Sequence, residues 1–323
     1  MDARGIRGVG SRVEGDMVTV LMPVRDTPGP MLDQAIESIL SQTCARFEFL
    51  IVDDGSRSLE TVEAIAQARR RDSRIRVEAT EGIGITRALN LGLSLANGKW
   101  IARQDADDWS EPDRIAKQVE FFEANPTAVL CGTAAWTHRS DGRKLWKAAM
   151  PGSHAEILRA LEAGNPFFHG SAMFLKRAAL EVGGYREAFA CSQDYDFFWR
   201  LAEHGQAANL GEALYHYRYG HGSVSALRAG EQARAQIAAR RLARARRDGD
   251  AEDVAGAFEG AHADWGTELK QADHVLLAGG YLAALRAYWQ VVRRHPWRPA
   301  AWGKLARWGV FVAAPAAREW CFR

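Results

Sequence analysis

Short apolar runs alternate with segments of helical periodicity through the first two thirds of the chain. Residues 17–24 (MVTVLMPV) and 47–52 (FEFLIV) are almost continuously apolar, which is typical of strands that are buried on both faces. Between them, Leu32, Ile36 and Ile39 repeat at helical spacing. Further strands are expected at residues 75–79, 99–102, 127–131, 171–175 and 214–219. Strands that alternate with helices in this way predict a parallel sheet with helices on both faces.

Two of the expected strands run directly into acidic residues. Residues 53–54 (DD) end the second strand, and residues 105–108 (DADD) follow the fourth. Ligands of such sheets bind beyond the carboxyl ends of the strands, so both acidic segments are expected to face one cleft. Carboxylates this close repel one another unless solvent or a cation lies among them, and oxygen ligands suit Mg²⁺ or Mn²⁺. Such a cation would hold a nucleotide diphosphate; the alternative is a solvated loop that caps the next helix.

Composition narrows the class of protein further. The 323 residues are 47% hydrophobic and 25% charged, with a formal net charge of +2, which is ordinary for a globular protein and gives no bulk attraction to nucleic acid. Four cysteines without a CxxC pair argue against a zinc site or a disulfide framework and suit a reducing compartment. The polar, glycine-rich residues 1–16 are expected to be a disordered lead rather than a targeting segment. No apolar run is long enough to span a membrane.

The composition changes at about residue 226, where alanine and arginine begin to dominate and helices are expected to the end. Residues 276–306 have the small-residue spacing and closing proline of one helical hairpin of tetratricopeptide type. From residue 276 onward, the sequence has seven Arg and one Lys but only a single Glu. The same stretch holds five tryptophans: Trp289, Trp297, Trp302, Trp308 and Trp320.

This basic, tryptophan-rich tail fits more than one interpretation. One is a helical surface that lies at the headgroup level of an anionic membrane. The other is an ordinary helical subdomain with tryptophan in its core. Binding of single-stranded nucleic acid ranks below both, because nothing upstream supports it.

The order of the motifs resembles the family 2 inverting glycosyltransferases, which have the GT-A-type nucleotide-diphospho-sugar fold. The similar segments lie within about residues 18–225, roughly two thirds of the chain: MVTVLMPV, FEFLIVDDGS, GITRALNLGL with GKWIARQDADDW, HGSAMF, GGYRE, SQDYDFFWRLAEHG and YHYRYGHGSVS. Within the family, the chain looks most like the bacterial enzymes that build surface polysaccharides and lipopolysaccharide side chains.

This resemblance implies an α/β fold of GT-A type, with a Rossmann-like, mostly parallel sheet, followed by an α-helical C-terminal region. The chain would divide into a lead (1–16), a glycosyltransferase domain (17–225) and a helical region (226–323). It would act in the cytoplasm, and the membrane interpretation of the C-terminal helices would place it on the inner face of the cell membrane. Its partners would be a nucleotide-sugar donor and a saccharide or lipid-linked saccharide acceptor, with no nucleic acid.

The resemblance also assigns residues to the donor. Asp54 would accept a hydrogen bond from the N3–H of a uracil ring, which favours UDP as the nucleotide. Asp105 would hold the ribose, and Arg87 would lie near the diphosphate. The end of the first strand would form a wall beside the base through Pro23, Val24 and Arg25.

Metal binding falls to Asp107, which would ligate the Mn²⁺ or Mg²⁺ that bridges both phosphates. His221 would be a second metal ligand or a contact to the diphosphate. Asp108 would only place negative charge near the start of the next helix.

Asp194 matches the catalytic base of the family, although Gln193 replaces the glutamate that usually precedes it. It would take the proton from the acceptor hydroxyl in a single displacement that inverts the anomeric centre. The dipole of the helix that begins here is expected to lower the pKa of Asp194 and make it a weak base. Asp196 would be structural and cap the helix, and His169 would either line the acceptor side or be a satisfied structural histidine.

Two other functions remain open from the residues. A nucleotidyltransferase shares the fold type and an Asp-based metal site, but it usually has a Gly-rich basic loop where residues 25–29 (RDTPG) are poor in glycine. A non-catalytic, membrane-associated scaffold is the second alternative, and the intact Asp54, Asp105, Asp107 and Asp194 argue against it. The sugar, the acceptor and the linkage cannot be read from the sequence.

Overall fold

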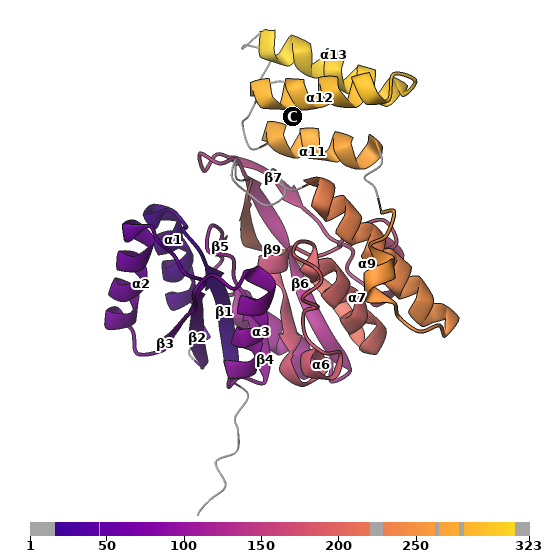
Figure 1. Cartoon of the computed structure of the whole chain (residues 1–323). Coiled ribbons are helices and arrows are strands. Elements are labelled where there is room, and N and C mark those ends of the chain that lie inside the picture. The colour runs from indigo at the N-terminus through magenta and orange to yellow at the C-terminus, as the bar shows by residue number, and fades with distance from the viewer. Residues whose placement is uncertain (1–16, 45, 220–228, 262–264, 278–280, 314–323) are drawn as a thin grey trace, which may run out of the picture.

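The computed structural model of the chain describes residues 17–44, 46–219, 229–261, 265–277 and 281–313 (Figure 1). The predicted lead at 1–16 and the predicted ligand His221 lie outside the described residues.

The first half of the chain is a run of parallel strands joined by helices. Its elements are β1 (Val18–Val24), α1 (Gly29–Leu40), β2 (Phe47–Asp53), α2 (Leu59–Arg71), β3 (Ile75–Ala79), α3 (Ile85–Leu95) and β4 (Trp100–Arg103). β1 lies between β2 and β4, and β3 forms the edge next to β2. All seven residues of β1 are buried, as its continuous apolar run predicts. The predicted parallel sheet is therefore confirmed for this half.

The second half extends the sheet with mixed pairing. It contains β5 (Trp109–Ser110), α4 (Arg114–Ala124), β6 (Ala128–His138), β7 (Lys144–Ala148), α5 (His154–Leu161), β8 (Met173–Leu175), α6 (Lys176–Glu181), α7 (Gln193–His204) and β9 (Gln206–Arg218). The strand order is β3-β2-β1-β4-β8-β6-β9-β5, with β7 paired to β6. β8 runs antiparallel to β4 and β6, and β5 runs antiparallel to β9, whereas β6 and β9 are parallel.

The local predictions were less accurate in this half. β6 and β9 are longer than the strands expected at 127–131 and 214–219, because burial holds alanine- and glycine-containing sequence with little strand preference in the sheet. The strand expected at 171–175 begins instead with a 3₁₀ turn, His169–Ser171, before β8. The helices α5 and α6 were not predicted.

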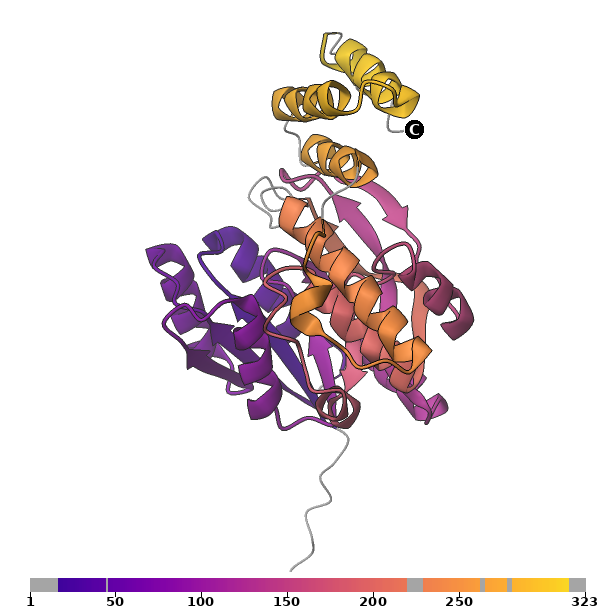
Figure 2. The ribbon, with the colours of Figure 1, turned by 45° about the vertical axis from the view of Figure 1, so that its right-hand side comes forward.

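Helices cover both faces of the sheet. One core packs α1, α2 and α4 against it, and the other packs α3, α5, α6 and α7 against the opposite face. The second core also takes in α9 (Ala229–Asp248) and α10 (Val254–Ala257). Figure 2 shows α9 lying along α7, in front of the sheet.

The last helices form a separate layer with its own small core. α11 (Trp265–Leu277), α12 (Tyr281–Arg294) and α13 (Pro299–Ala313) stack beyond β7 in Figure 1, around residues such as Tyr288 and Ala272. α12 and α13 form the predicted helical hairpin. The division of the chain at residue 225 stays a prediction, since α9 and α10 pack with the sheet while α11–α13 do not share its core.

The tail tryptophans whose side chains are described are exposed rather than buried. Trp297 is 90% exposed, Trp289 49% and Trp302 46%. For these three, the interpretation of a tryptophan core is wrong. No helix within the described residues is long and apolar enough to cross a membrane.

Candidate active site

The carboxyl ends of β2, β1 and β4 lie side by side, as the sequence predicted. The N–H of Asp54 donates to the Val24 carbonyl (2.8 Å), and the N–H of Gln104 donates to the Leu21 carbonyl (3.1 Å). The two acidic strand ends therefore flank β1 at one edge of the sheet.

Asp54 is buried and its carboxylate is well supplied with donors. Oδ1 accepts from the Thr80 hydroxyl (2.7 Å) and the Ile83 N–H (2.6 Å), and Oδ2 accepts from the Gly84 N–H (2.9 Å). Arg25 Nη1 lies 3.5 Å from Oδ2. A carboxylate has about four acceptor positions, so little capacity remains for a ligand. Asp54 thus fixes the loop 80–84 across the end of β2.

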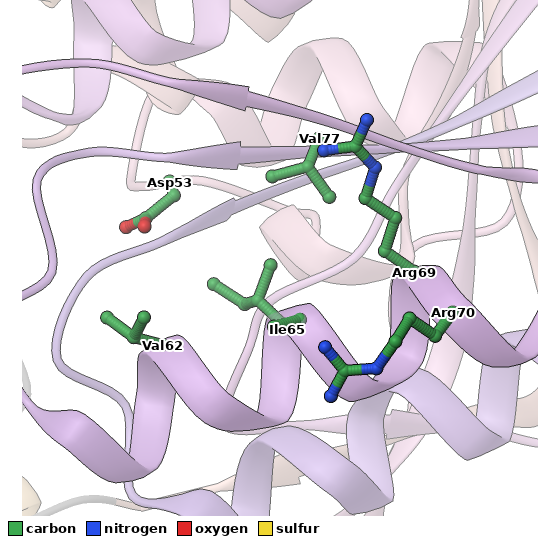
Figure 3. A pocket seen from close by; sticks show the side chains of 7 residues that line it. Asp53, Val62, Ile65, Arg69, Arg70 and Val77 are labelled. Atoms are coloured by element: carbon green, nitrogen blue, oxygen red, sulfur yellow. The ribbon is translucent and has the colours of Figure 1, made fainter.

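Asp53 points the other way, because successive side chains of a strand face opposite sides of the sheet. It lines a shallow hollow between α2 and β3 together with apolar side chains and two arginines (Figure 3); the lining residues are Asp53, Val62, Ile65, Ala66, Arg69, Arg70 and Val77. One Asp53 oxygen accepts the Ser56 N–H at 3.0 Å. This hollow lies at the edge strand, away from Asp105 and Asp107.

The other residues predicted to contact the donor differ in accessibility. Pro23 and Val24 are buried, and only Arg25 of the predicted wall is exposed. Arg87 is exposed and pairs with Glu187 at 2.8 Å, so its side chain is engaged at the surface of α3.

Asp105 is held by a buried arginine. Arg103 has no exposed surface; its Nη2 donates to Asp105 Oδ1 (2.6 Å), its Nη1 to the Leu21 carbonyl (2.7 Å), and its Nε to His169 Nε2 (3.1 Å). Burial and then the nearby Arg103 hold the pKa of His169 well below its usual value, so the ring is neutral. Arginine can only donate, so Nε2 is the acceptor and Nδ1 carries the proton of His169.

Asp108, the last residue of the acidic loop 105–108, has a buried side chain. Its carboxylate accepts from the Tyr215 hydroxyl (2.9 Å) and from the Arg218 N–H (2.7 Å). Burial, followed by Asp107 and Asp105, raises its pKa well above the ordinary value. The prediction that Asp108 only places charge near a helix is wrong, because α4 begins at Arg114 and Asp108 joins the loop to β9 instead.

Asp107 differs from both neighbours because no other residue in the described part of the chain donates a hydrogen bond to its side-chain oxygens. Its backbone carbonyl accepts from Arg218 Nη1 (2.9 Å), which fixes the residue but leaves the carboxylate free. Burial and then repulsion from Asp105 raise the pKa of Asp107 to about 6. A partly buried carboxylate without a compensating donor fits a cation.

The side chains around Asp107 can supply only part of the coordination shell of a divalent cation. No cluster of three or more His, Cys, Asp or Glu side chains suited to a metal exists within the described residues. Mg²⁺ and similar ions commonly take only one or two protein carboxylates and complete their shell with water and substrate phosphates. The residues present therefore suit a metal that arrives with a diphosphate better than a permanently bound one.

β5 fixes the acidic loop against β9 through stacked rings. Trp109 lies parallel to His216 at 4.6 Å between ring centroids and 8° between planes. His216 contacts His138 (Nδ1 to Nε2, 2.9 Å) and Glu111 (Nε2 to Oε1, 2.8 Å). The guanidinium of Arg218 also lies over the Trp109 ring, 5.0 Å from its centroid. This packing makes the Asp107 loop a rigid part of the sheet.

Asp194 lies in the first turn of α7, with Ser192 rather than Asp194 at the N-cap. Asn165 Nδ2 donates to Asp194 Oδ2 at 2.7 Å. Burial raises the pKa of Asp194 to about 6, and Asp105 adds to the increase, whereas a backbone N–H and Asn165 act against it. The predicted decrease was wrong, because removal of the carboxylate from water outweighs the helix terminus.

Asp196 is structural, as predicted, but it is not a cap. Arg186 Nη1 (3.2 Å), Arg200 Nε (3.0 Å) and Arg200 Nη2 (2.7 Å) all donate to its buried carboxylate. These two arginines occupy the Asp196 carboxylate with three hydrogen bonds.

Sequence reasoning missed the residues that hold the acidic ones in place. Arg103 stands directly before the cluster, and an arginine at the end of a buried strand is a signal that could have been used. Tyr215 and Asn165 lie far from the cluster in sequence, and only the pairing of distant strands brings them to it.

Similar proteins point to one family. Residues 19–184 match the family model described as glycosyl transferase family 2. An uncharacterized glycosyltransferase of Haemophilus influenzae is 30% identical over 68% of this chain and 82% of its own length. The amylovoran biosynthesis glycosyltransferase AmsE of Erwinia amylovora is 29% identical over 70% of this chain and 85% of its own length. The O-antigen biosynthesis glycosyltransferase WbnJ of Escherichia coli is 31% identical over 63% and 80%.

Solved structures agree on the fold. The mannosyltransferase PcManGT from Pyrobaculum calidifontis, in complex with GDP-Man and Mn²⁺, superposes with a TM-score of 0.55 at 20% identity over 94% of this chain and 82% of that one. Staphylococcus aureus TarS 1-349 in complex with UDP gives 0.55 at 14% identity over 80% of this chain and 70% of that one. With its GT-A-type fold, this chain belongs to glycosyltransferase family 2.

Proposed function

We propose that the chain transfers a sugar from a nucleotide-diphosphate donor, with UDP as the expected nucleotide, to a hydroxyl of a saccharide or lipid-linked saccharide. The observation that carries this proposal is the gathering of Asp105, Asp107 and Asp194 at one edge of the sheet, where two of the three carboxylates have a raised pKa. The relatives in amylovoran and O-antigen biosynthesis support an acceptor of this class.

The proposed reaction is one displacement with inversion. Asp194 accepts the proton of the acceptor hydroxyl while that oxygen forms a bond to the anomeric carbon. The bond from that carbon to the diphosphate oxygen breaks on the opposite face, and the electron pair leaves with the diphosphate. A pKa of about 6 leaves Asp194 ionised at neutral pH and stronger as a base than an ordinary aspartate.

Asp107 would hold the divalent cation, and Asp105 beside it would hold the ribose of the donor. A Mn²⁺ or Mg²⁺ ion there supplies positive charge against the leaving diphosphate. Arg103 orients Asp105, burial and then Arg103 keep the pKa of His169 low and its ring neutral, and Arg25 and Asp54 would lie beside the base. Arg87 and His221 stay predicted donor and metal contacts.

The test is a thermal-shift screen of nucleotide sugars with Mn²⁺ on the full-length protein. The correct donor should raise the melting temperature by mass action, and Asp107→Ala should remove both this shift and Mn²⁺-dependent transfer. Full transfer activity in excess chelator would refute the metal assignment. Release of pyrophosphate instead of nucleoside diphosphate would favour a nucleotidyltransferase.

The exposed face of α12 supports membrane contact at the inner face of the cell membrane. Leu282, Arg286, Trp289 and Arg293 recur at helical spacing and are all exposed, and Trp297 follows. Apolar side chains among arginines suit the headgroup region of an anionic bilayer. The paired variant Trp289→Ala/Trp297→Ala should reduce sedimentation with phosphatidylglycerol-containing vesicles roughly tenfold at low salt. If the wild-type protein does not sediment with such vesicles, the membrane interpretation is wrong and α11–α13 are a plain helical subdomain.

A further inference from the structure

Four aromatic side chains form a continuous row beside the acidic loop. Ring centroids are 5.3 Å apart for Phe168 and Tyr217, 5.1 Å for Tyr217 and Tyr219, and 6.0 Å for Tyr219 and Trp146. All four side chains are partly or well exposed, and Trp146 is 37% exposed. They come from three separate segments, namely the loop after α5, the end of β9 and β7. The row is therefore assembled at the surface rather than inside either sheet core.

The row begins at the catalytic edge. Phe168 lies between His169, which contacts Arg103, and Asn165, which donates to Asp194. Tyr217 follows Tyr215 on the same face of β9, because side chains of a strand repeat every second residue. Tyr217 is only partly exposed, and its removal from water, followed by the carboxylates of the acidic loop, raises the pKa of its hydroxyl.

Three polar atoms at this surface, on Tyr217, Trp146 and His169, have no hydrogen-bond partner within the described residues. Within the described part of the chain, nothing hydrogen-bonds to the Tyr217 hydroxyl or to the indole N–H of Trp146; the hydroxyl is not sealed from solvent, and Trp146 is an exposed residue. The same holds for the Nδ1–H of His169. The surface thus combines apolar ring faces with unused donors, which is the usual lining of a small-molecule site.

We propose that Phe168, Tyr217, Tyr219 and Trp146 bind a sugar ring of the acceptor and present its hydroxyl to Asp194. A pyranose has one face of C–H groups and a rim of hydroxyls. The electron-rich faces of the aromatic rings attract the C–H face, and the free donors can bind the rim. This inference rests on the proposed glycosyl transfer and names the site of its second substrate.

The nucleotide base is the other ring that could stack here, and the strand order argues against it. Asp54 ends β2, on the far side of β1 from β4. The row lies around β9, which is separated from β4 by β8 and β6 on the opposite side. A donor with its base near Asp54 and its diphosphate at Asp107 therefore reaches the row only with its sugar end.

Binding can be measured without knowing the natural acceptor. Methyl glycosides of glucose, galactose, mannose and N-acetylglucosamine serve as probes in saturation-transfer NMR with the full-length protein, UDP and Mn²⁺. At least one should bind, and Trp146→Ala should weaken its affinity roughly five- to tenfold. Trp146→Phe keeps a stacking ring and should retain most of the affinity. Leu180→Ala removes an exposed apolar side chain elsewhere, on α6, and should change nothing.

The outcomes separate this inference from the proposed function. Binding of UDP with Mn²⁺ but of none of the four glycosides would refute the aromatic row as an acceptor site. So would a Trp146→Ala protein that binds the glycoside as well as the wild type. Neither result would refute the proposed glycosyl transfer. An equal loss in Trp146→Phe and Trp146→Ala would also refute stacking. If neither UDP nor GDP binds with Mn²⁺, the proposed function itself fails. Melting temperatures of each variant show that weaker binding is not unfolding.

Discussion

The two acidic strand ends have similar sequences but different chemistry. At the end of β2, Asp54 accepts three hydrogen bonds from the loop 80–84 and has an arginine nearby. At the end of β4, Asp107 has a free carboxylate and a pKa raised to about 6. The difference comes from the donors nearby: the loop 80–84, which follows β3, turns its N–H groups toward Asp54, whereas Arg218 of β9 and Gln104 bind the carbonyls of the 105–108 loop. The donors nearby thus decide whether an aspartate side chain fixes a loop or stays free to bind a cation.

Asp194, like Asp107, has a pKa raised to about 6 by burial, and its substitution should have the largest effect. Asp194→Asn keeps the size of the side chain and removes the proton acceptor. Turnover should fall on the order of 10²–10⁴-fold, the range of general base catalysis, while donor affinity changes little. Steady-state kinetics and calorimetric donor binding measure the two quantities.

Loss of a hydrogen bond at the helix start should not account for this result, because the side-chain oxygen of asparagine can still accept the backbone N–H that Asp194 accepts in the first turn of α7. Near-normal turnover in a folded Asp194→Asn protein would remove Asp194 from the mechanism. Asp196 could not replace it, since Arg186 and Arg200 hold its carboxylate.

Asp54→Ala should be the more destabilising of the changes at the β2 end. It leaves the N–H groups of Ile83 and Gly84 and the Thr80 hydroxyl without their acceptor, so the free energy of unfolding should fall by about 2–4 kcal/mol. Urea unfolding measures this. The matched control is Asp53→Ala, which loses a single hydrogen bond to Ser56 and should cost about 1 kcal/mol. Equal losses would show that Asp54 is not the anchor of the loop.

The sequence predicted the first half of the fold and the positions of the acidic residues well. Buried parallel strands such as β1 have an unmistakable apolar pattern, and their carboxyl ends must meet at one edge. It could not predict the electrostatic state of the carboxylates. Burial of Asp194 and the pairing of Asn165 with it depend on contacts between segments far apart in sequence, so the direction of the pKa shift was missed. The mixed second half was missed for a similar reason, because tertiary burial overrode weak local preference in β6 and β9.

The raised pKa of Asp194 predicts that kcat/KM depends on pH in a range where an aspartate of ordinary pKa would cause no change. The base must be ionised, so kcat/KM should rise with pH and level off above a pKa of about 6. At pH 5 only about a tenth of such a group is ionised, and the rate should be about tenfold below the plateau. An aspartate of ordinary pKa would retain nearly full activity there. An acid limb near pH 4 would contradict the burial of Asp194 in the working enzyme.

The smallest expected effect has the opposite sign to that of Asp54→Ala. Asp107→Asn removes a charge that burial and Asp105 disfavour, so the metal-free protein should become more stable at pH 7.5, on the order of 1–2 kcal/mol after allowance for partial exposure. The folded pKa lies above the unfolded one, so the cost of the wild-type charge is full above about pH 6 and disappears as the pH falls toward 4. The stability difference should shrink in the same window. Urea unfolding in chelator at pH 7.5 and pH 4 measures it, with the exposed Asp33→Asn on α1 as the control that should change little. A destabilised Asp107→Asn protein at pH 7.5 would place Asp107 with Asp54 among the anchors, and the distinction between the two strand ends would fail.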